Sequence, residues 1–261
     1  MKLPQTKAPV VVVVAGGIDP SGGAGLLRDV ATAAACGARA HAVGTAWTEQ
    51  GDRVHRVEPR SPAAVRDALA AAVATLRPAA IKIGMAVGPA TAAALIEGLG
   101  DYAGPVVLDP VLATSRGGSL WDGEPVELAP LLRRATLVTP NAAEAGELAG
   151  HQVETGAGAE TAARVLITRD RVRAVLVKGG HIDQAESIVT DALLTPDEAR
   201  RFSRPRVPGP TPRGTGCALA TAIAVELGRG RPLADAVESA GTWLAGAIAS
   251  AVDVGGERHL G

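Results

Sequence analysis

The sequence lacks the features typical of membrane-spanning, secreted and nucleic-acid-binding proteins. Although 47% of its 261 residues are hydrophobic, no run approaches the roughly eighteen consecutive apolar residues that cross a bilayer. The first ten residues contain two lysines but no apolar stretch of signal-peptide length. The formal net charge of −1 supplies no basic field for nucleic acid or anionic lipid. We therefore expect a soluble, cytoplasmic protein that binds neither membranes nor nucleic acids.

Cysteine and lysine are both scarce. Cys36 and Cys217 are far apart in the sequence and have different neighbours, which favours reduced thiols over a structural disulfide. The chain uses arginine as its general cation, and its only lysines are Lys2, Lys7, Lys82 and Lys178. Because arginine and lysine are not equivalent where a compact ammonium contacts phosphate, a lysine within the folded body is a candidate site residue. A solvated surface lysine is the alternative for each.

Short apolar runs alternate with Ala-rich amphipathic segments. The runs cover residues 10–15, 38–44, 80–83, 105–109, 135–139 and 172–177. Their continuous hydrophobicity predicts strands buried on both faces, and Ser61-Pro62 and Pro89 are typical helix starts between them. The alternation predicts one α/β domain over residues 1–261, with a doubly wound, mainly parallel sheet covered by helices on both faces.

The last third of the chain departs from this alternation. The run that begins at Asp191 predicts a further strand, and residues 214–227 and 233–252 predict two consecutive helices. We expect residues 255–261 to fray. Ligand sites in doubly wound folds lie beyond the carboxyl ends of the strands, which is where the polar motifs should meet.

A glycine-rich turn follows the first predicted strand. Residues 15–25 read AGGIDPSGGAG and precede a predicted helix, so backbone N–H groups there can approach a ligand closely. The spacing matches neither a dinucleotide-binding loop nor a Walker loop, and tight packing of strand on helix explains the glycines about as well. Asp29, one turn into the helix, is either a site carboxylate or a solvated group that compensates the helix dipole.

A second glycine-rich segment opens a helix near the C-terminal end. Gly214-Thr215-Gly216 leaves backbone donors unobstructed, and such donors can form an anion hole for a transferring phosphoryl group. Cys217 lies in the first turn, where we expect the helix field to lower the pKa of its thiol. A small buried cysteine at a glycine-enabled helix start is the alternative.

Polar side chains follow several of the predicted strands. Asp109, Asn141 and Glu144 offer oxygen ligands suited to Mg²⁺, although an aspartate at a strand end is often only a turn former. Lys178, in VKGG, is placed to neutralise a phosphate. Lys82, in the apolar AIKIGM, has either a site role or a structural ion pair.

Together these motifs resemble those of the hydroxymethylpyrimidine/phosphomethylpyrimidine kinases of thiamin synthesis, in the ribokinase-like superfamily. The shared motifs are GGIDPSGGAG with Asp29, TAWTEQ, IKIGM, VVLDPVL, TPNAAEA, VKGG and GTGC, from about residue 10 to about residue 251. The resemblance implies a ribokinase-like fold and an ATP-dependent kinase that acts on hydroxymethylpyrimidine, its phosphate or both. It also implies ATP and Mg²⁺ as co-substrates and a homodimer.

The resemblance further implies roles for individual residues. Those around the pyrimidine are Gly17, Asp29, Met85, Val111 and Gln50, the last recognising the polar edge of the ring. The anion hole is formed by Gly214, Thr215 and Gly216, and Cys217 stands where sugar kinases of the superfamily have an aspartate base. The positions around the metal and the ATP phosphates are Asp109 and Glu144 as metal ligands, with Lys178, Asn141 and Thr211 for the nucleotide.

The chain departs from the family pattern at three places. Pro212-Arg213 stands where a Thr-His pair is usual, which removes one hydroxyl and one backbone donor near the phosphates. Ser115, followed by Arg116, stands where many members carry a lysine. The segment between Gln50 and Glu58 is short, which affects the flap over the substrate.

Two alternatives remain open at this stage. A pyridoxal or pyridoxine kinase of the same fold fits similar motifs, since fold does not determine substrate. A non-catalytic pyrimidine-binding sensor has only Pro212, Arg213 and Ser115 in its favour.

Overall fold

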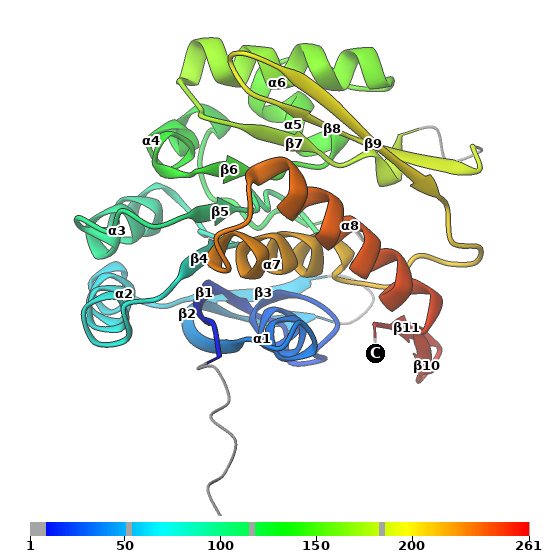
Figure 1. Ribbon diagram of the computed structural model, residues 1–261. Helices are drawn as coiled ribbons and strands as arrows, with labels where there is room; N and C mark the ends of the chain where they lie inside the picture. Colours follow the sequence, from blue (N-terminus) through cyan, green and yellow to red (C-terminus); the bar gives the residue numbers. More distant parts are fainter. Residues whose placement is uncertain (1–8, 51–53, 115–117, 183–185, 261) are drawn as a thin grey trace, which may run out of the picture.

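The computed structural model describes residues 9–50, 54–114, 118–182 and 186–260 (Figure 1). Its strands are β1 (Val11–Ile18), β2 (Arg39–Gln50), β3 (Val54–Pro59), β4 (Ala80–Ile83), β5 (Val106–Leu108), β6 (Leu137–Val138), β7 (Val175–Val177), β8 (Ile188–Leu194), β9 (Ala199–Pro205), β10 (Val252–Val254) and β11 (Glu257–His259). Its helices are α1 (Gly25–Ala35), α2 (Pro62–Leu76), α3 (Pro89–Leu99), α4 (Ala129–Arg134), α5 (Ala142–Ala149), α6 (Gly156–Asp170), α7 (Thr215–Gly228) and α8 (Leu233–Ala249). Short 3-10 turns are η1 (Pro125–Leu128) and η2 (Gly179–His181).

The main sheet confirms the predicted α/β class. Its order is β3-β2-β1-β4-β5-β6-β7-β8-β9, and the pairs from β2 to β7 are parallel. The strand order reverses from one side of β1 to the other, which is the crevice-forming arrangement of a doubly wound fold. Because all parallel strands end at the same edge, the polar residues that follow them are brought together.

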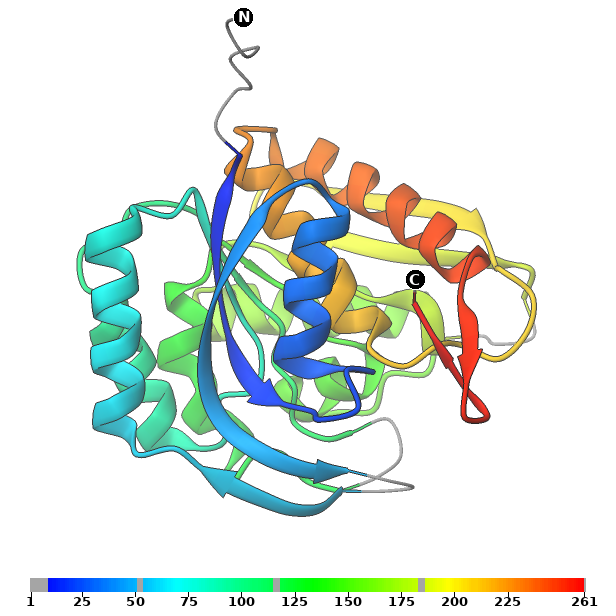
Figure 2. The ribbon, with the colours of Figure 1, turned by 90° about the horizontal axis from the view of Figure 1, so that it is seen from below.

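Helices cover both faces of the sheet, as Figures 1 and 2 show. Alternate residues of β1 divide between two cores: Val13 and Ala15 pack with helices α2 to α6, whereas Val12 and Val14 pack with α1, α7 and α8. Burial on both faces explains why the central strands are continuous apolar runs.

The antiparallel strands at the two edges are only partly predicted. The strand after Asp191 is confirmed within β8, but β3 and β9 have no apolar run. Strand β9 reads ARRFSRP and is largely exposed, so its pairing with β8 defines it rather than hydrophobic periodicity.

The expectation that residues 255–261 fray is wrong for the described part of that segment. Strands β10 and β11 form an antiparallel hairpin, and Leu260 is only 4% exposed, packed in the core beside α1 and α7. Arg28 donates to the Leu260 carbonyl at 2.9 Å, and the backbone N–H of Arg213 donates to Arg258. One apolar anchor and these hydrogen bonds hold the hairpin in place.

None of the helices in the described ranges combines the length and the apolar character that a membrane crossing requires.

We predict that Leu260→Ala lowers the free energy of unfolding by about 2 kcal/mol, because it removes a buried anchor. Val252→Ala, on the same hairpin but with Val252 54% exposed, is the matched control and should change it by less than about 0.5 kcal/mol. Urea denaturation measures both, and hydrogen exchange of residues 252–260 detects local release. Equal effects of the two substitutions would contradict the anchoring role of Leu260.

Candidate active site

A cavity of about 470 Å³ lies at the carboxyl edge of the parallel strands. Every predicted site residue whose side chain the structure describes lines it: Gly17, Asp29, Met85, Asp109, Val111, Asn141, Glu144, Lys178, Thr211, Gly214, Thr215, Gly216 and Cys217. The side chain of Gln50, and the residues Ser115 and Arg116, lie outside the part of the chain that the structure describes. The fold therefore gathers motifs from six separate segments around one space.

The start of α7 packs directly on the glycine-rich turn that follows β1. Gly214 has φ +72°, a left-handed conformation that favours glycine, and a side chain there would collide with the carbonyl oxygen of Gly23. A Cβ at Gly216 would lie 3.1 Å from the Lys178 Nζ and 3.9 Å from Asp109 Oδ2. Glycines at these positions let the first backbone N–H groups of α7 approach the charged centre of the cavity.

The unusual residue Arg213 has a structural explanation. Its Nη2 donates to Asp19 Oδ2 at 3.0 Å, and its Nη1 lies 3.6 Å from Glu257 Oε2. Asp19 is 1% exposed and also accepts from the Ser21 hydroxyl at 2.8 Å. Arg213 thus joins the glycine-rich turn, the start of α7 and the C-terminal hairpin.

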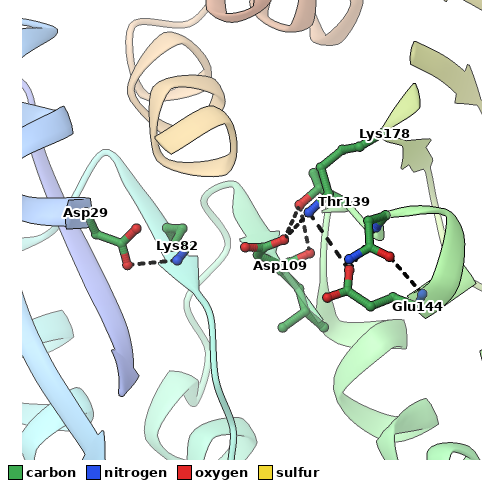
Figure 3. A network of polar contacts seen from close by, with 8 residues as sticks. Asp29, Lys82, Asp109, Thr139, Glu144 and Lys178 are labelled. Carbon is green, nitrogen blue, oxygen red and sulfur yellow. Dashed lines mark hydrogen bonds and ion pairs between the residues drawn. The ribbon is translucent and has the colours of Figure 1, made fainter. Parts of the chain in front are cut away.

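Lys178 and Asp109 form the centre of a polar network (Figure 3). Lys178 Nζ donates to Asp109 Oδ1 at 2.7 Å and lies 3.9 Å from Glu144 Oε2, and Thr139 donates to Asp109 Oδ1 at 3.3 Å. Burial alone would raise the pKa of Asp109, but Lys178 and Lys82 outweigh it and hold that pKa below its usual range. Asp109 is therefore ionised at neutral pH.

Glu144 and Asn141 have local structural partners as well. They form a capping box at the start of α5, in which each side chain accepts a backbone N–H of the other residue, at 2.8 and 2.9 Å. Burial raises the pKa of Glu144 to about 7, and the charge of Asp109 acts in the same direction against that of Lys178. Helix capping uses the single side-chain oxygen of Asn141, whose amide NH2 remains a donor, and one oxygen of Glu144, whose Oε1 remains available.

Asp29 and Lys82 form a second buried ion pair, shown at the left of Figure 3. Lys82 Nζ donates to Asp29 Oδ2 at 2.7 Å, and Thr221 donates to Asp29 Oδ1 at 2.8 Å. The two side chains are 0% and 1% exposed, so the alternatives of a solvated Asp29 and a surface Lys82 are both wrong. Although burial alone would lower the pKa of Lys82, the charges around it raise that pKa, and Lys82 remains an ammonium.

The expected lowering of the Cys217 pKa is also wrong. Burial raises the pKa of the Cys217 thiol to about 12, and Asp29 and Asp109 act in the same direction. Lys82 opposes this shift only in part. Loss of hydration and two nearby carboxylates outweigh the field of the helix N-terminus. Cys217 is a neutral thiol at pH 7, and Cys36, whose pKa is raised to about 11 by burial, is neutral too.

Several residues that line the cavity carried no signal in the sequence, because they lie on β8, on β9 and the segment that directly follows it, and on α8. They are Val189, Arg204, Arg206, Val207, Leu244, Ala245 and Ile248. Arg204 donates to Asp191 Oδ2 at 2.7 Å, and Asp191 Oδ1 accepts the N–H of Gly179 at 2.8 Å. This chain of contacts fixes the turn that follows Lys178, and the spacing of Arg204 and Arg206 by two residues, at and just after the end of β9, is the signal that could have indicated it.

Comparison with known proteins decides the family. Residues 19–260 match the phosphomethylpyrimidine kinase family. The chain belongs to the phosphomethylpyrimidine kinase family. As a member of that family it is a phosphotransferase, which favours an enzyme over the non-catalytic sensor.

Relatives of this family member are similar over most of their length. The hydroxymethylpyrimidine/phosphomethylpyrimidine kinase of Rhizobium meliloti is 38% identical over 239 residues, which cover 90% of this chain and 89% of the relative. The kinase of the same name from Escherichia coli is 37% identical over 244 residues, with the same coverage of 90% and 89%.

Solved structures confirm the ribokinase-like fold. A phosphomethylpyrimidine kinase from Clostridium difficile superposes with a TM-score of 0.75 at 27% identity, covering 92% of this chain and 100% of that one. A pyridoxal kinase from Staphylococcus aureus in complex with ADP gives a TM-score of 0.84 at 26% identity, with coverages of 96% and 92%.

We predict that alkylation of Cys217 by iodoacetamide accelerates roughly tenfold per pH unit from pH 7 to pH 10, because only the thiolate reacts. A thiol with a pKa of about 12 does not level off in this range, whereas an ordinary thiol does so above about pH 9. The rate is measured by mass spectrometry in a Cys36→Ala variant, in which Cys217 is the only thiol. A plateau at or below pH 9 would show that the thiol is not shifted upward.

Proposed function

We propose that this chain transfers the γ-phosphoryl group of ATP to hydroxymethylpyrimidine, to hydroxymethylpyrimidine phosphate, or to both. The observation that carries the proposal is that the N-terminus of α7 lies next to Lys178 and Asp109. A Cβ at Gly216 would lie only 3.1 Å from the Lys178 Nζ. Backbone donors, an ammonium and a carboxylate thus surround one point of the cavity. This arrangement suits a phosphoryl group that gains charge on its equatorial oxygens during transfer.

The walls of the cavity suit two flat heterocycles. Apolar side chains at the β1, β4 and β5 ends include Met85, Val111 and Leu120, and a second apolar set at the β8 and β9 side includes Leu244 and Ile248. Ligand sites of this kind combine apolar walls with a few polar groups that fix orientation. We assign the first set to the pyrimidine and the second to the nucleoside of ATP, so that the phosphates extend past Lys178.

Asp109 and Glu144 fit a magnesium ion. Among the described residues, Asp109 Oδ2 and Glu144 Oε1 have no hydrogen-bond partner, because the network uses the other oxygen of each. No three His, Cys, Asp or Glu side chains of those residues form a closed metal cage, and Mg²⁺ usually takes only one or two carboxylates together with substrate phosphates and water. Bound there, Mg²⁺ would supply charge neutralisation for the ATP phosphates.

The protein's own residues then act by positioning and by charge. Lys178 neutralises phosphate oxygens while Asp109 keeps it in place, and the first N–H groups of α7 bind the transferred phosphoryl group. A loose transition state needs little early removal of the acceptor proton. Cys217, as a neutral thiol, therefore holds the acceptor as a hydrogen-bond donor more readily than it removes a proton as a base.

The cytoplasmic location expected from the sequence and a homodimer complete the proposal, and the homodimer rests on the family resemblance. Light scattering of the purified protein measures the oligomeric state, and a monomer at micromolar concentration would contradict the dimer.

The function is tested by incubating the purified protein with Mg-ATP and one acceptor at a time, followed by mass analysis of the products. The acceptors are hydroxymethylpyrimidine, its monophosphate and pyridoxal, the last because the structural neighbours include pyridoxal kinases. We expect phosphorylated pyrimidine. Phosphorylation of pyridoxal alone would replace the proposal with the second candidate, and the absence of any product would contradict both.

We predict that Lys178→Met lowers kcat/KM for ATP by roughly 10- to 100-fold, because a charge-assisted contact to phosphate contributes about 1.5–3 kcal/mol. Arg201→Met is the control, since Arg201 is an exposed cation on β9 paired with Glu160 away from the cavity lining. Steady-state kinetics with varied ATP measure both variants. Equal kinetics of the two would remove Lys178 from the phosphate site.

A further inference from the structure

Lys82 is a charged residue in the middle of the parallel sheet that the functional assignments above do not use. It lies on β4 between Val14 of β1 and Val107 of β5. Its neighbours Ile81 and Ile83 enter the core with α2 and α3, so the lysine points to the α7 side of the sheet. Its side chain is 1% exposed and lines the cavity. A buried charge at such a position costs free energy unless it is paired.

The ammonium of Lys82 has more donors than the protein uses. A lysine ammonium carries three N–H donors, and among the described residues its single acceptor is Asp29 Oδ2, at 2.7 Å. The other oxygen of Asp29 is engaged by Thr221, so Asp29 is itself held rigidly. Two donors of an almost completely buried cation are left without an acceptor from the described chain, beside a cavity.

Gly84, two residues after Lys82 and just beyond the end of β4, keeps space beside this ammonium. A Cβ at Gly84 would lie 2.8 Å from Lys82 Nζ, closer than side-chain atoms pack. Figure 3 places Lys82 between Asp29 and Asp109, and the electrostatic influence of Lys82 extends to both Cys217 and Asp109. The ammonium therefore shares the cavity with the residues assigned to the pyrimidine and with the α7 N-terminus, where the acceptor oxygen has to lie.

A purely structural ion pair explains these features less well. Replacing a buried ion pair with apolar residues of similar volume is often neutral or stabilising, so the Asp29–Lys82 pair is a poor device for stability. Thr221, which fixes the second oxygen of Asp29, shows that the carboxylate is oriented and not only neutralised.

We propose that Lys82 contacts the substrate: its two remaining N–H groups hold the acceptor oxygen, and they favour an acceptor that is a phosphate over a neutral hydroxymethyl group. The inference rests on the proposed function, which it deepens by naming the residue that selects the acceptor. An ammonium binds a phosphate dianion more strongly than a hydroxyl, because charge-assisted hydrogen bonds are about twice as strong and little water screens them in a buried site. Asp29 is the residue that positions this ammonium.

The test compares Asp29→Asn with the double variant Asp29→Asn/Lys82→Met. The pair removes the lysine on a background without the Asp29 carboxylate, so that neither protein carries an uncompensated buried aspartate, and Asp109, whose charge also acts on Lys82, is present in both. We expect the double variant to have a further loss of kcat/KM of roughly 10²-fold or more with the pyrimidine monophosphate. The loss with hydroxymethylpyrimidine should be at least several-fold smaller, and the Kd for ATP, measured separately, should not change between the two.

Equal kcat/KM values for the single and double variants with both acceptors would overturn the contact, and equal losses with both acceptors would overturn the preference for phosphate. Wild-type protein is assayed in parallel with both pyrimidines. If it phosphorylates neither, the proposed function fails; if it is active while the variants behave alike, only the Lys82 inference fails.

A measurement that leaves Lys82 and Asp29 unchanged covers the case in which the double variant does not fold. The chain has only four lysines, so selective ¹⁵N labelling of lysine gives few ammonium signals, and Lys178→Met removes one of the two that line the cavity. We expect the remaining cavity signal, from Lys82, to shift on addition of pyrimidine monophosphate without ATP. An unchanged Lys82 signal at a saturating concentration of the monophosphate would overturn the proposal.

Discussion

A parallel sheet that is buried on both faces requires every charged group at its carboxyl edge to find a partner. This protein meets that requirement with two lysine–aspartate pairs on neighbouring segments, Lys82 with Asp29 and Lys178 with Asp109. Lys82 lies on β4 and Lys178 directly follows β7, and these two strands run in the same direction and are otherwise apolar. Both lysines line the cavity that the start of α7 also lines. The paired charges give the cavity a fixed field before any ligand binds, and such preorganisation is what phosphoryl transfer needs.

The same field determines the state of Cys217. A cysteine in the first turn of a helix is ordinarily a candidate thiolate, yet Asp29 and Asp109 lie close enough to oppose the helix dipole, and burial adds to their effect. A site rich in cations can thus contain a neutral thiol, because each cation is already balanced by a carboxylate. Reactivity at such a position depends on the complete set of neighbours and not on the helix terminus alone.

The sequence predicts those parts of the molecule whose signal is local. The central strands are continuous apolar runs, and the glycine and polar motifs directly follow them, so both the parallel part of the sheet and the glycine and polar part of the cavity lining could be anticipated. The pairing of Lys82 with Asp29 could not, because 53 residues separate the two, and they meet only through the pairing of β4 with β1 and the packing of α1 on the sheet. Strand β9 and the C-terminal hairpin also escaped prediction, since β9 is defined by its partner strand and the hairpin by one buried leucine.

Arg213 shows how a departure from a family pattern can leave the chemistry in place. Its backbone N–H donates to Arg258, and its guanidinium is engaged by Asp19 and Glu257. Proline at the preceding position has no N–H to offer. Neither residue therefore supplies the hydroxyl and the backbone donor of a Thr-His pair, and in the function proposed here phosphate binding relies on the α7 N-terminus and Lys178. The charge of Arg213 instead fixes the glycine-rich turn, and because Gly214 packs on the carbonyl of Gly23, fixing that turn also fixes the position of the α7 N-terminus.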